Sequence, residues 1–82
     1  MVEIIFDRKN NRSVAHDGNI EVGECDFIES ANSWNIIHTE VNKEYQGQGI
    51  ARKLVEKVLE YAKKEHKEIM AECSYAKKVI EK

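Results

Sequence analysis

The N-terminal half of the chain carries the hydrophobic pattern of β-strands. Apolar residues alternate with polar ones, or β-branched and aromatic residues gather in short runs, as in strands with one buried face. The dipeptide Asp17-Gly18 readily adopts positive φ angles and favours a hairpin that pairs the second strand with the third. The strands expected from this pattern cover residues 2–6, 12–16, 19–28 and 34–41.

From residue 50 onward the hydrophobic period lengthens from two residues to about 3.6. Ile50, Leu54 and Val58 recur at every fourth position, and charged side chains fill the opposite side of this repeat. The pattern predicts an amphipathic helix over residues 50–64, with its charged face in solvent.

A second strand and a second helix follow. Residues 69–73 have the composition of a short fifth strand, and Ser74 is a typical cap for a last short helix that runs to Ile80. The passage from the fourth strand through the long helix to the fifth needs a crossover, so these two strands are expected to be parallel. The predicted fold class is therefore α/β (α+β): a mixed, mostly antiparallel sheet of about five strands, a central amphipathic helix and a short C-terminal helix.

Length and charge narrow the class of protein further. A chain of 82 residues is too short to divide its buried surface between two cores, so residues 1–82 are expected to form a single domain. With 13 basic and 15 acidic residues the net charge is −2, which disfavours nucleic acid and membrane lipid as partners. No apolar run reaches the roughly 18 residues of a membrane span, and no basic leader precedes the first apolar run. The chain is expected to be cytoplasmic.

The two cysteines, Cys25 and Cys73, lie far apart in the sequence and form no cluster with histidine at metal-ligand spacing. No metal is therefore expected. A cytosolic chain normally keeps such thiols reduced, so both are predicted to be free.

The most informative motif is Gln46-Gly47-Gln48-Gly49-Ile50-Ala51, which joins the fourth predicted strand to the long helix. A helix N-terminus has backbone N–H groups without intrahelical partners and a partial positive charge, and both suit a phosphate. Glycines at this turn let a pyrophosphate approach the backbone closely. No Lys-Ser or Lys-Thr pair follows, and a lone Gly-x-Gly falls short of the dinucleotide fingerprint, so a metal-free pyrophosphate is the better match.

The motif resembles the pyrophosphate-binding pattern of the GCN5-related N-acetyltransferase superfamily, (Arg/Gln)-x-x-Gly-x-(Gly/Ala), with Gln46, Gly49 and Ala51 at its defining positions. A narrower similarity is to a subfamily of small single-domain acetyltransferase-like proteins. The chain shares with that subfamily the pair His38-Thr39, the glycine turn and Cys73. The resemblance covers residues 17–79. It implies a minimal acetyltransferase-like fold and acetyl-CoA (coenzyme A) as the cofactor.

The resemblance also assigns expected roles around the cofactor. The backbone of the glycine turn is expected to face the pyrophosphate, and backbone groups near Val41 to pair with the pantetheine arm. Arg52 is either a phosphate contact or a solvated helix charge. The expected cofactor-binding residues are Val41, Gln46, Gly47, Gln48, Gly49, Ile50, Ala51 and Arg52.

Two residues are candidates for catalysis. His38 is either a general base for an amine acceptor or a packed strand residue. Cys73 is either a core cysteine or a reactive thiol that accepts the acetyl group or orients the thioester. For Tyr75, packing is favoured over protonation of a leaving thiolate.

The sequence thus predicts an acetyl-CoA-binding acyltransferase that transfers acetyl to an amine, directly or through a cysteine thiol. The acceptor, a small amine or a protein or peptide, is not defined, because the superfamily's helices after its first strand and its closing strands have no counterpart here. One alternative is a non-catalytic acyl-CoA-binding or regulatory module. A small nucleic-acid-binding α/β module fits less well with the acidic balance.

Overall fold

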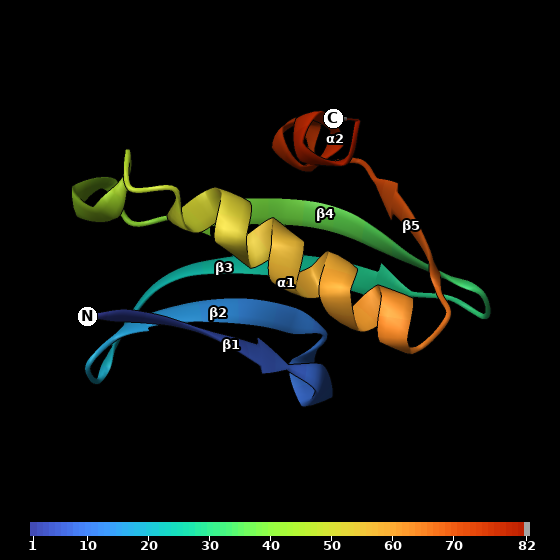
Figure 1. The fold of residues 1–82 in the computed structure, drawn as a ribbon, viewed down its shortest axis with the longest axis horizontal. Coiled ribbons are helices and arrows are strands. Elements are labelled where there is room, and N and C mark those ends of the chain that lie inside the picture. The colour runs from blue at the N-terminus through green and yellow to red at the C-terminus, as the bar shows by residue number, and fades with distance from the viewer. Residues whose placement is uncertain (82) are drawn as a thin grey trace.

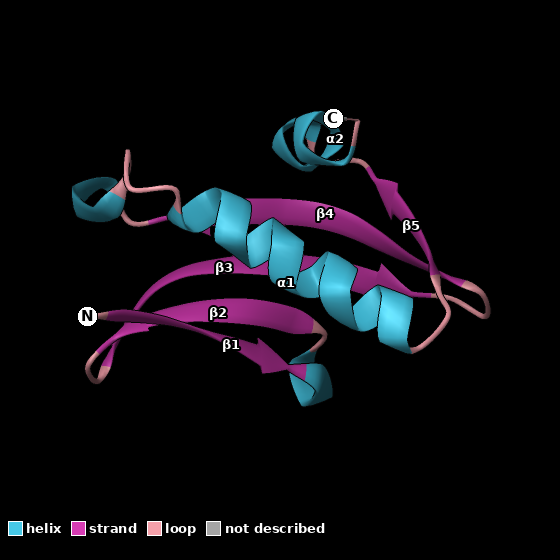
Figure 2. Cartoon of the chain, viewed as in Figure 1, coloured by secondary structure: helices cyan, strands magenta, loops and turns pink. Residues whose placement is uncertain are grey.

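The computed structural model describes residues 1–81 and confirms the predicted fold class. A five-stranded sheet has the order β1-β2-β3-β4-β5, with antiparallel pairing except between β4 and β5, which are parallel. Figures 1 and 2 show the long helix crossing one face of this sheet. In chain order the elements are β1 (Val2–Asp7), the 3-10 turn η1 (Arg8–Asn10), β2 (Arg12–Asp17), β3 (Ile20–Glu29), β4 (Ser33–Val41), the 3-10 turn η2 (Lys43–Tyr45), α1 (Ile50–Lys64), β5 (Glu68–Ala71) and α2 (Ser74–Ile80).

The core lies between the sheet and the two helices. The apolar stripe of α1 packs on the aromatic side chains of the sheet, among which Phe27 and Trp34 stack with ring centroids 4.2 Å apart. Phe6 of β1 stacks on Tyr61 of α1 at 4.1 Å, which closes the edge of the core. Ala76 of α2 is fully buried in the same cluster. Both helices therefore cover one face of the sheet, called here the helical face, and the opposite face is called the outer face.

The end of β5 and the start of α2 differ from the prediction. The strand ends at Ala71 rather than at Cys73, because the N–H groups of Glu72 and Cys73 both donate to the Ile36 carbonyl and the parallel ladder stops there. Ser74 is not the cap of α2. Cys73 has the extended backbone of an N-cap residue, and its carbonyl accepts the bond from Lys77 N–H.

The edge of β4 is open beyond this point. A bulge leaves Ile37 without an opposite residue on β3, because Ile36 pairs with Phe27 and His38 pairs with Asp26. On its other side β4 pairs with β5 only up to Ile36. Its last residues thus expose one backbone edge toward α1 and α2. Within residues 1–81, no helix has both the length and the apolar character that crossing a membrane requires.

Leu54 holds α1 on the sheet and gives a test of this packing. Its side chain is fully buried, and Leu54 Cδ1 would lie 3.2 Å from a Cβ placed on Gly23, so the helix and β3 approach closely here. Leu54→Ala is expected to lower the free energy of unfolding by about 3 kcal/mol, a large part of the stability of a small domain. Urea denaturation measures this. Lys53→Ala, one position along and exposed, is the control and should stay within about 0.5 kcal/mol of wild type.

Candidate active site

A cavity of about 490 Å³ opens beside the free edge of β4. The turn before α1 forms one wall, and Tyr75 of α2 closes the opposite end. Six of the eight residues expected to bind the cofactor line it, whereas Gln48 and Arg52 do not. The lining residues are Thr39, Val41, Tyr45, Gln46, Gly47, Gly49, Ile50, Ala51 and Tyr75.

The glycine turn has the backbone geometry of an anion cradle. Gly47 and Gly49 have φ angles of 84° and 78°, which side chains rarely adopt, and a Cβ placed on either would meet no atom within 4 Å. Gly49 is the N-cap of α1 and provides no side-chain cap. The N–H groups of the first helical turn therefore have no intrahelical or side-chain acceptor, and the positive end of the helix dipole faces the cavity.

The open edge of β4 presents backbone groups to the same cavity. Asn42 N–H donates to the Val22 carbonyl at 2.7 Å, so Asn42 faces β3 and the preceding Val41 faces away from it. Gln46 Nε2 donates to the Val41 carbonyl at 3.2 Å. The Gln46 side chain thus ties the turn to the strand. Thr39, two residues before Val41, points its backbone groups the same way.

Thr39 and the two cysteines form a chain of contacts under α2. Thr39 Oγ1 donates to Cys25 Sγ at 3.5 Å, and Cys73 Sγ donates to Thr39 Oγ1 at 3.6 Å. Thr39 also lines the cavity, so this hydroxyl connects the Cys73 thiol to the cavity wall. The crossover through α1 and β5 brings Cys73 and Thr39 together from distant parts of the sequence.

The two thiols differ in acidity because their surroundings differ. Burial alone would raise the pKa of Cys73. Hydrogen bonds from the N–H groups of Ala76, Tyr75 and Thr39 and the bond with the Thr39 hydroxyl have a larger combined effect in the opposite direction, so the pKa of this thiol lies below its ordinary value. Burial raises the pKa of Cys25 to about 12. Cys73 is half-buried and Cys25 is fully buried. Of the two, only Cys73 is both accessible and inclined to ionise.

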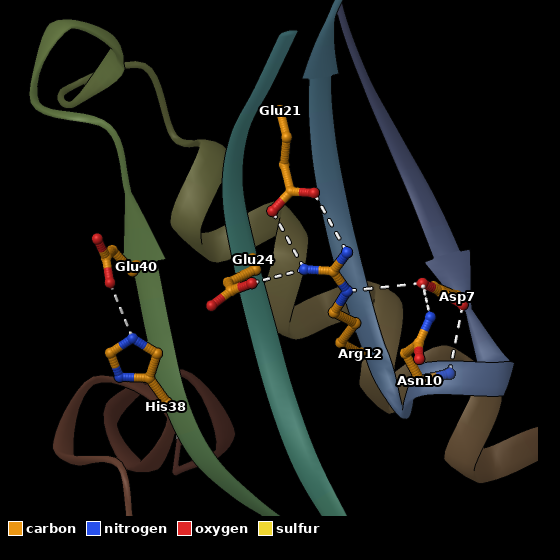
Figure 3. A network of polar contacts seen from close by, with 7 residues as sticks. All are labelled: Asp7, Asn10, Arg12, Glu21, Glu24, His38 and Glu40. Atoms are coloured by element: carbon orange, nitrogen blue, oxygen red, sulfur yellow. Dashed lines mark hydrogen bonds and ion pairs between the residues drawn. The ribbon is translucent and has the colours of Figure 1, made fainter.

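His38 lies on the outer face, away from the cavity lining. Its Nε2 is 3.0 Å from Glu40 Oε1, and both side chains project from the side of β4 opposite Thr39 (Figure 3). His38, Glu24 and Asp26 bring three possible metal-ligand atoms within 4.8 Å of one another. Arg12 already binds Glu24 at 2.6 Å, however, and we assign no ion to this group.

The outer face is acidic and holds a second cavity of about 560 Å³. Glu21, Glu24 and Glu40 line it, and Arg12 neutralises the first two through ion pairs of 3.1 and 2.6 Å (Figure 3). Although this cavity is the larger one, its three carboxylates outnumber the two cations beside them, Arg12 and Lys43, and the remaining negative charge disfavours a phosphate. The cavity at the glycine turn is therefore the better candidate for an anionic cofactor.

Arg52 and Thr39 differ from the other candidate residues in what the sequence indicates about them. The Arg52 guanidinium pairs with Glu56 one helical turn later at 3.1 Å, as an exposed helix charge does. In the sequence, Thr39 stands out only as part of the pair His38-Thr39 that the chain shares with the small subfamily. The two-residue period counted from buried Trp34 and Ile36 would place His38 on the helical face. The bulge at Ile37 reverses the alternation and puts Thr39 on the face of buried Val41 instead, and the sequence carries no signal for that bulge.

Comparisons with known proteins identify the family of the chain. The family model described as GCN5-related N-acetyl-transferase matches residues 12–82. A solved GCN5-like putative N-acetyltransferase from Staphylococcus aureus is 34% identical with a TM-score of 0.73, and the match covers 96% of this chain and 78% of that one. Comparison with curated protein sequences gives no match.

Two larger proteins share the fold over part of their length. A GCN5-related N-acetyltransferase from Sphaerobacter thermophilus is 25% identical with a TM-score of 0.70, over 78% of this chain but only 22% of that one. A chain of the NatC complex, solved with Gag peptide and CoA, is 30% identical with a TM-score of 0.66, over 85% of this chain and 54% of that one. The present chain thus spans only a fraction of these relatives. Because the family model matches residues 12–82, which is most of the chain, the chain belongs to the GCN5-related N-acetyltransferase family.

Proposed function

We propose that the chain binds acetyl-CoA in the cavity beside β4 and transfers the acetyl group to an amine. The observation that carries this proposal is a single cavity with an anion cradle at one end and an ionisable thiol near the other. The backbone N–H groups of residues 47–51 bind the pyrophosphate, since that of Gln46 already donates to the Lys43 carbonyl. The free edge of β4 near Val41 pairs with the pantetheine arm. The thioester then lies near Thr39, Cys73 and Tyr75.

Cys73 carries the acetyl group in this proposal. The Cys73 thiolate attacks the thioester carbonyl, the carbon–sulfur bond to coenzyme A breaks, and coenzyme A leaves as a thiolate that takes up a proton. The amine then attacks the acetylated Cys73, loses a proton and regenerates the thiol. The N–H groups around the sulfur stabilise the thiolate before each turnover. The Thr39 hydroxyl accepts from the Cys73 thiol and donates to Cys25, and it adds to this stabilisation when it turns its proton to the ionised Cys73.

The acceptor reaches the thioester from the outer face, where β4 and β5 are no longer paired after Ile36. The test is to incubate the protein with acetyl-CoA and a panel of amines, among them polyamines and lysine peptides, and to follow free coenzyme A and the acetylated amine by mass spectrometry. If the protein bound acetyl-CoA but released no coenzyme A with any of the amines tested, the result would instead support a non-catalytic acyl-CoA-binding module.

His38 is proposed as the base for an amine that arrives from the outer face, where its ring lies next to Glu40. His38→Gln is expected to keep acetyl-CoA affinity and to lower the transfer rate by about 10²-fold at neutral pH. The loss should shrink at alkaline pH, because an amine that is already deprotonated needs no base. Initial rates as a function of pH measure this effect.

Glu40→Gln is the matched control for that variant, since it removes the partner of the ring but keeps the ring. It should retain most of the transfer rate. An unchanged pH profile in His38→Gln would return His38 to a structural role on the strand.

A further inference from the structure

We propose that Cys73 is also a redox-modification site, at which coenzyme A disulfide bound in the cavity forms a mixed disulfide with the thiol and blocks acetyl transfer. The inference rests on the proposed coenzyme site and extends it to the oxidised form of the cofactor. The adduct would fill the cavity with one coenzyme A per chain.

The geometry that suits thioester chemistry also suits disulfide exchange. A pantetheine arm laid along the free edge of β4 ends near Thr39, and Cys73 Sγ lies 3.6 Å from Thr39 Oγ1. Whether the arm ends in a thioester or in a disulfide, its sulfur therefore arrives next to the Cys73 thiol. Cys73 is half-buried, so its thiol can attack a disulfide sulfur seated beside Thr39 without unfolding of α2.

The exchange needs no further oxidant. The Cys73 thiolate attacks the sulfur of the seated half of coenzyme A disulfide, that sulfur–sulfur bond breaks, and a new one joins Cys73 to coenzyme A. The other half leaves as a thiolate and takes up a proton. This step requires a thiolate, and the N–H groups and the Thr39 hydroxyl around the sulfur favour it by lowering the pKa of Cys73.

Cys25 does not resolve the adduct. Its thiol is fully buried and its pKa is raised to about 12, so it supplies almost no thiolate at neutral pH. Thr39 also lies between the two sulfurs, with contacts of 3.5 and 3.6 Å. The mixed disulfide therefore persists until an external thiol reduces it, and the coenzyme A redox state would set the fraction of active protein.

The experiment treats the reduced full chain with coenzyme A disulfide and follows the intact mass and acetyl transfer. Modification of Cys73 should saturate with reagent concentration and exceed the rate with glutathione disulfide by about tenfold or more, because the cavity holds the reagent in place. Acetyl-CoA should protect Cys73 from modification by occupying the cavity, and dithiothreitol should restore acetyl transfer by reducing the mixed disulfide. Cys25→Ala should react as wild type does, whereas Gly49→Glu should lose the preference for coenzyme A disulfide.

Thr39 supplies a readout that a merely structural residue would not move. Thr39→Val removes the hydroxyl at nearly constant volume and should shift the pH profile of the modification to higher pH, and Thr39→Ser should restore it. Equal rates with glutathione disulfide, or modification at Cys25, would overturn the proposal. If wild type and Cys73→Ser both bind acetyl-CoA by calorimetry but no adduct forms, this inference alone fails. If wild type has no coenzyme affinity, the proposed function fails with it.

Discussion

Gly49→Glu is expected to lower the affinity for acetyl-CoA by about 100-fold or more. The substitution places a carboxylate at the N-cap of α1, where the N–H groups of the first turn face the cavity. A negative charge there competes with the pyrophosphate for the same donors and repels it. Isothermal titration calorimetry with acetyl-CoA measures the loss, and urea denaturation verifies that the variant is folded.

Gly49→Ala separates charge from backbone strain. The φ angle of 78° costs alanine roughly 1 kcal/mol, as it would glutamate, and no atom lies within 4 Å of the added Cβ. Both variants should therefore lose similar stability, while only glutamate should abolish binding. A folded Gly49→Glu protein with wild-type affinity would remove the cofactor site from the glycine turn.

The elements with strong local signals could be predicted from the sequence. The helix α1 runs over Ile50–Lys64 as its 3.6-residue period indicates, because its apolar stripe needs the sheet and its N-terminus follows a glycine in the left-handed region. The hairpin at Asp17-Gly18 is equally local, and Gly18 has a φ of 63°. Such features depend on neighbouring residues alone.

The end of β5 depended on a contact that sequence spacing does not contain. Ile36 accepts two N–H groups, from Glu72 and Cys73, and this forked bond ends the strand before Cys73. Cys73 continues the alternation of Ile69 and Ala71 past that point, so the pattern predicted a longer strand. The correct N-cap of α2 follows from the tertiary contact and not from capping propensity.

The candidate site also has a part that depends on local sequence and a part that depends on tertiary contacts. The anion cradle is local to residues 46–51 and could be found in the sequence, whereas the catalytic end joins Thr39 of β4 to Cys73 at the start of α2. That meeting depends on the parallel pairing of β4 with β5 and on the separation of the two strands after Ile36. Without the bulge at Ile37 the alternation would place His38 on the cavity side and Thr39 on the outer face, so this irregularity decides which of the two side chains lines the cavity.

Incubation with acetyl-CoA in the absence of an acceptor is expected to leave one hydroxylamine-labile acetyl group on Cys73. The exchange is feasible without a large driving force, because one thioester replaces another of similar energy. Cys25 is the internal control: its buried thiol, with a pKa of about 12, should stay unmodified. Peptide mass spectrometry locates the label, and Cys73→Ala should lack it.

Cys73→Ala is further expected to lower acetyl transfer by about 100-fold or more while keeping acetyl-CoA affinity near that of wild type, since the pyrophosphate donors lie on the other end of the cavity. Cys25→Ala should keep both the label and the transfer rate. The loss of rate without loss of affinity distinguishes a nucleophile from a cysteine that only packs, because a packing defect would reduce stability and affinity together. If Cys73→Ala retained full transfer and the label appeared on Cys25 or lysines, the amine would attack the thioester directly, and Cys73 would be a residue that packs against the core.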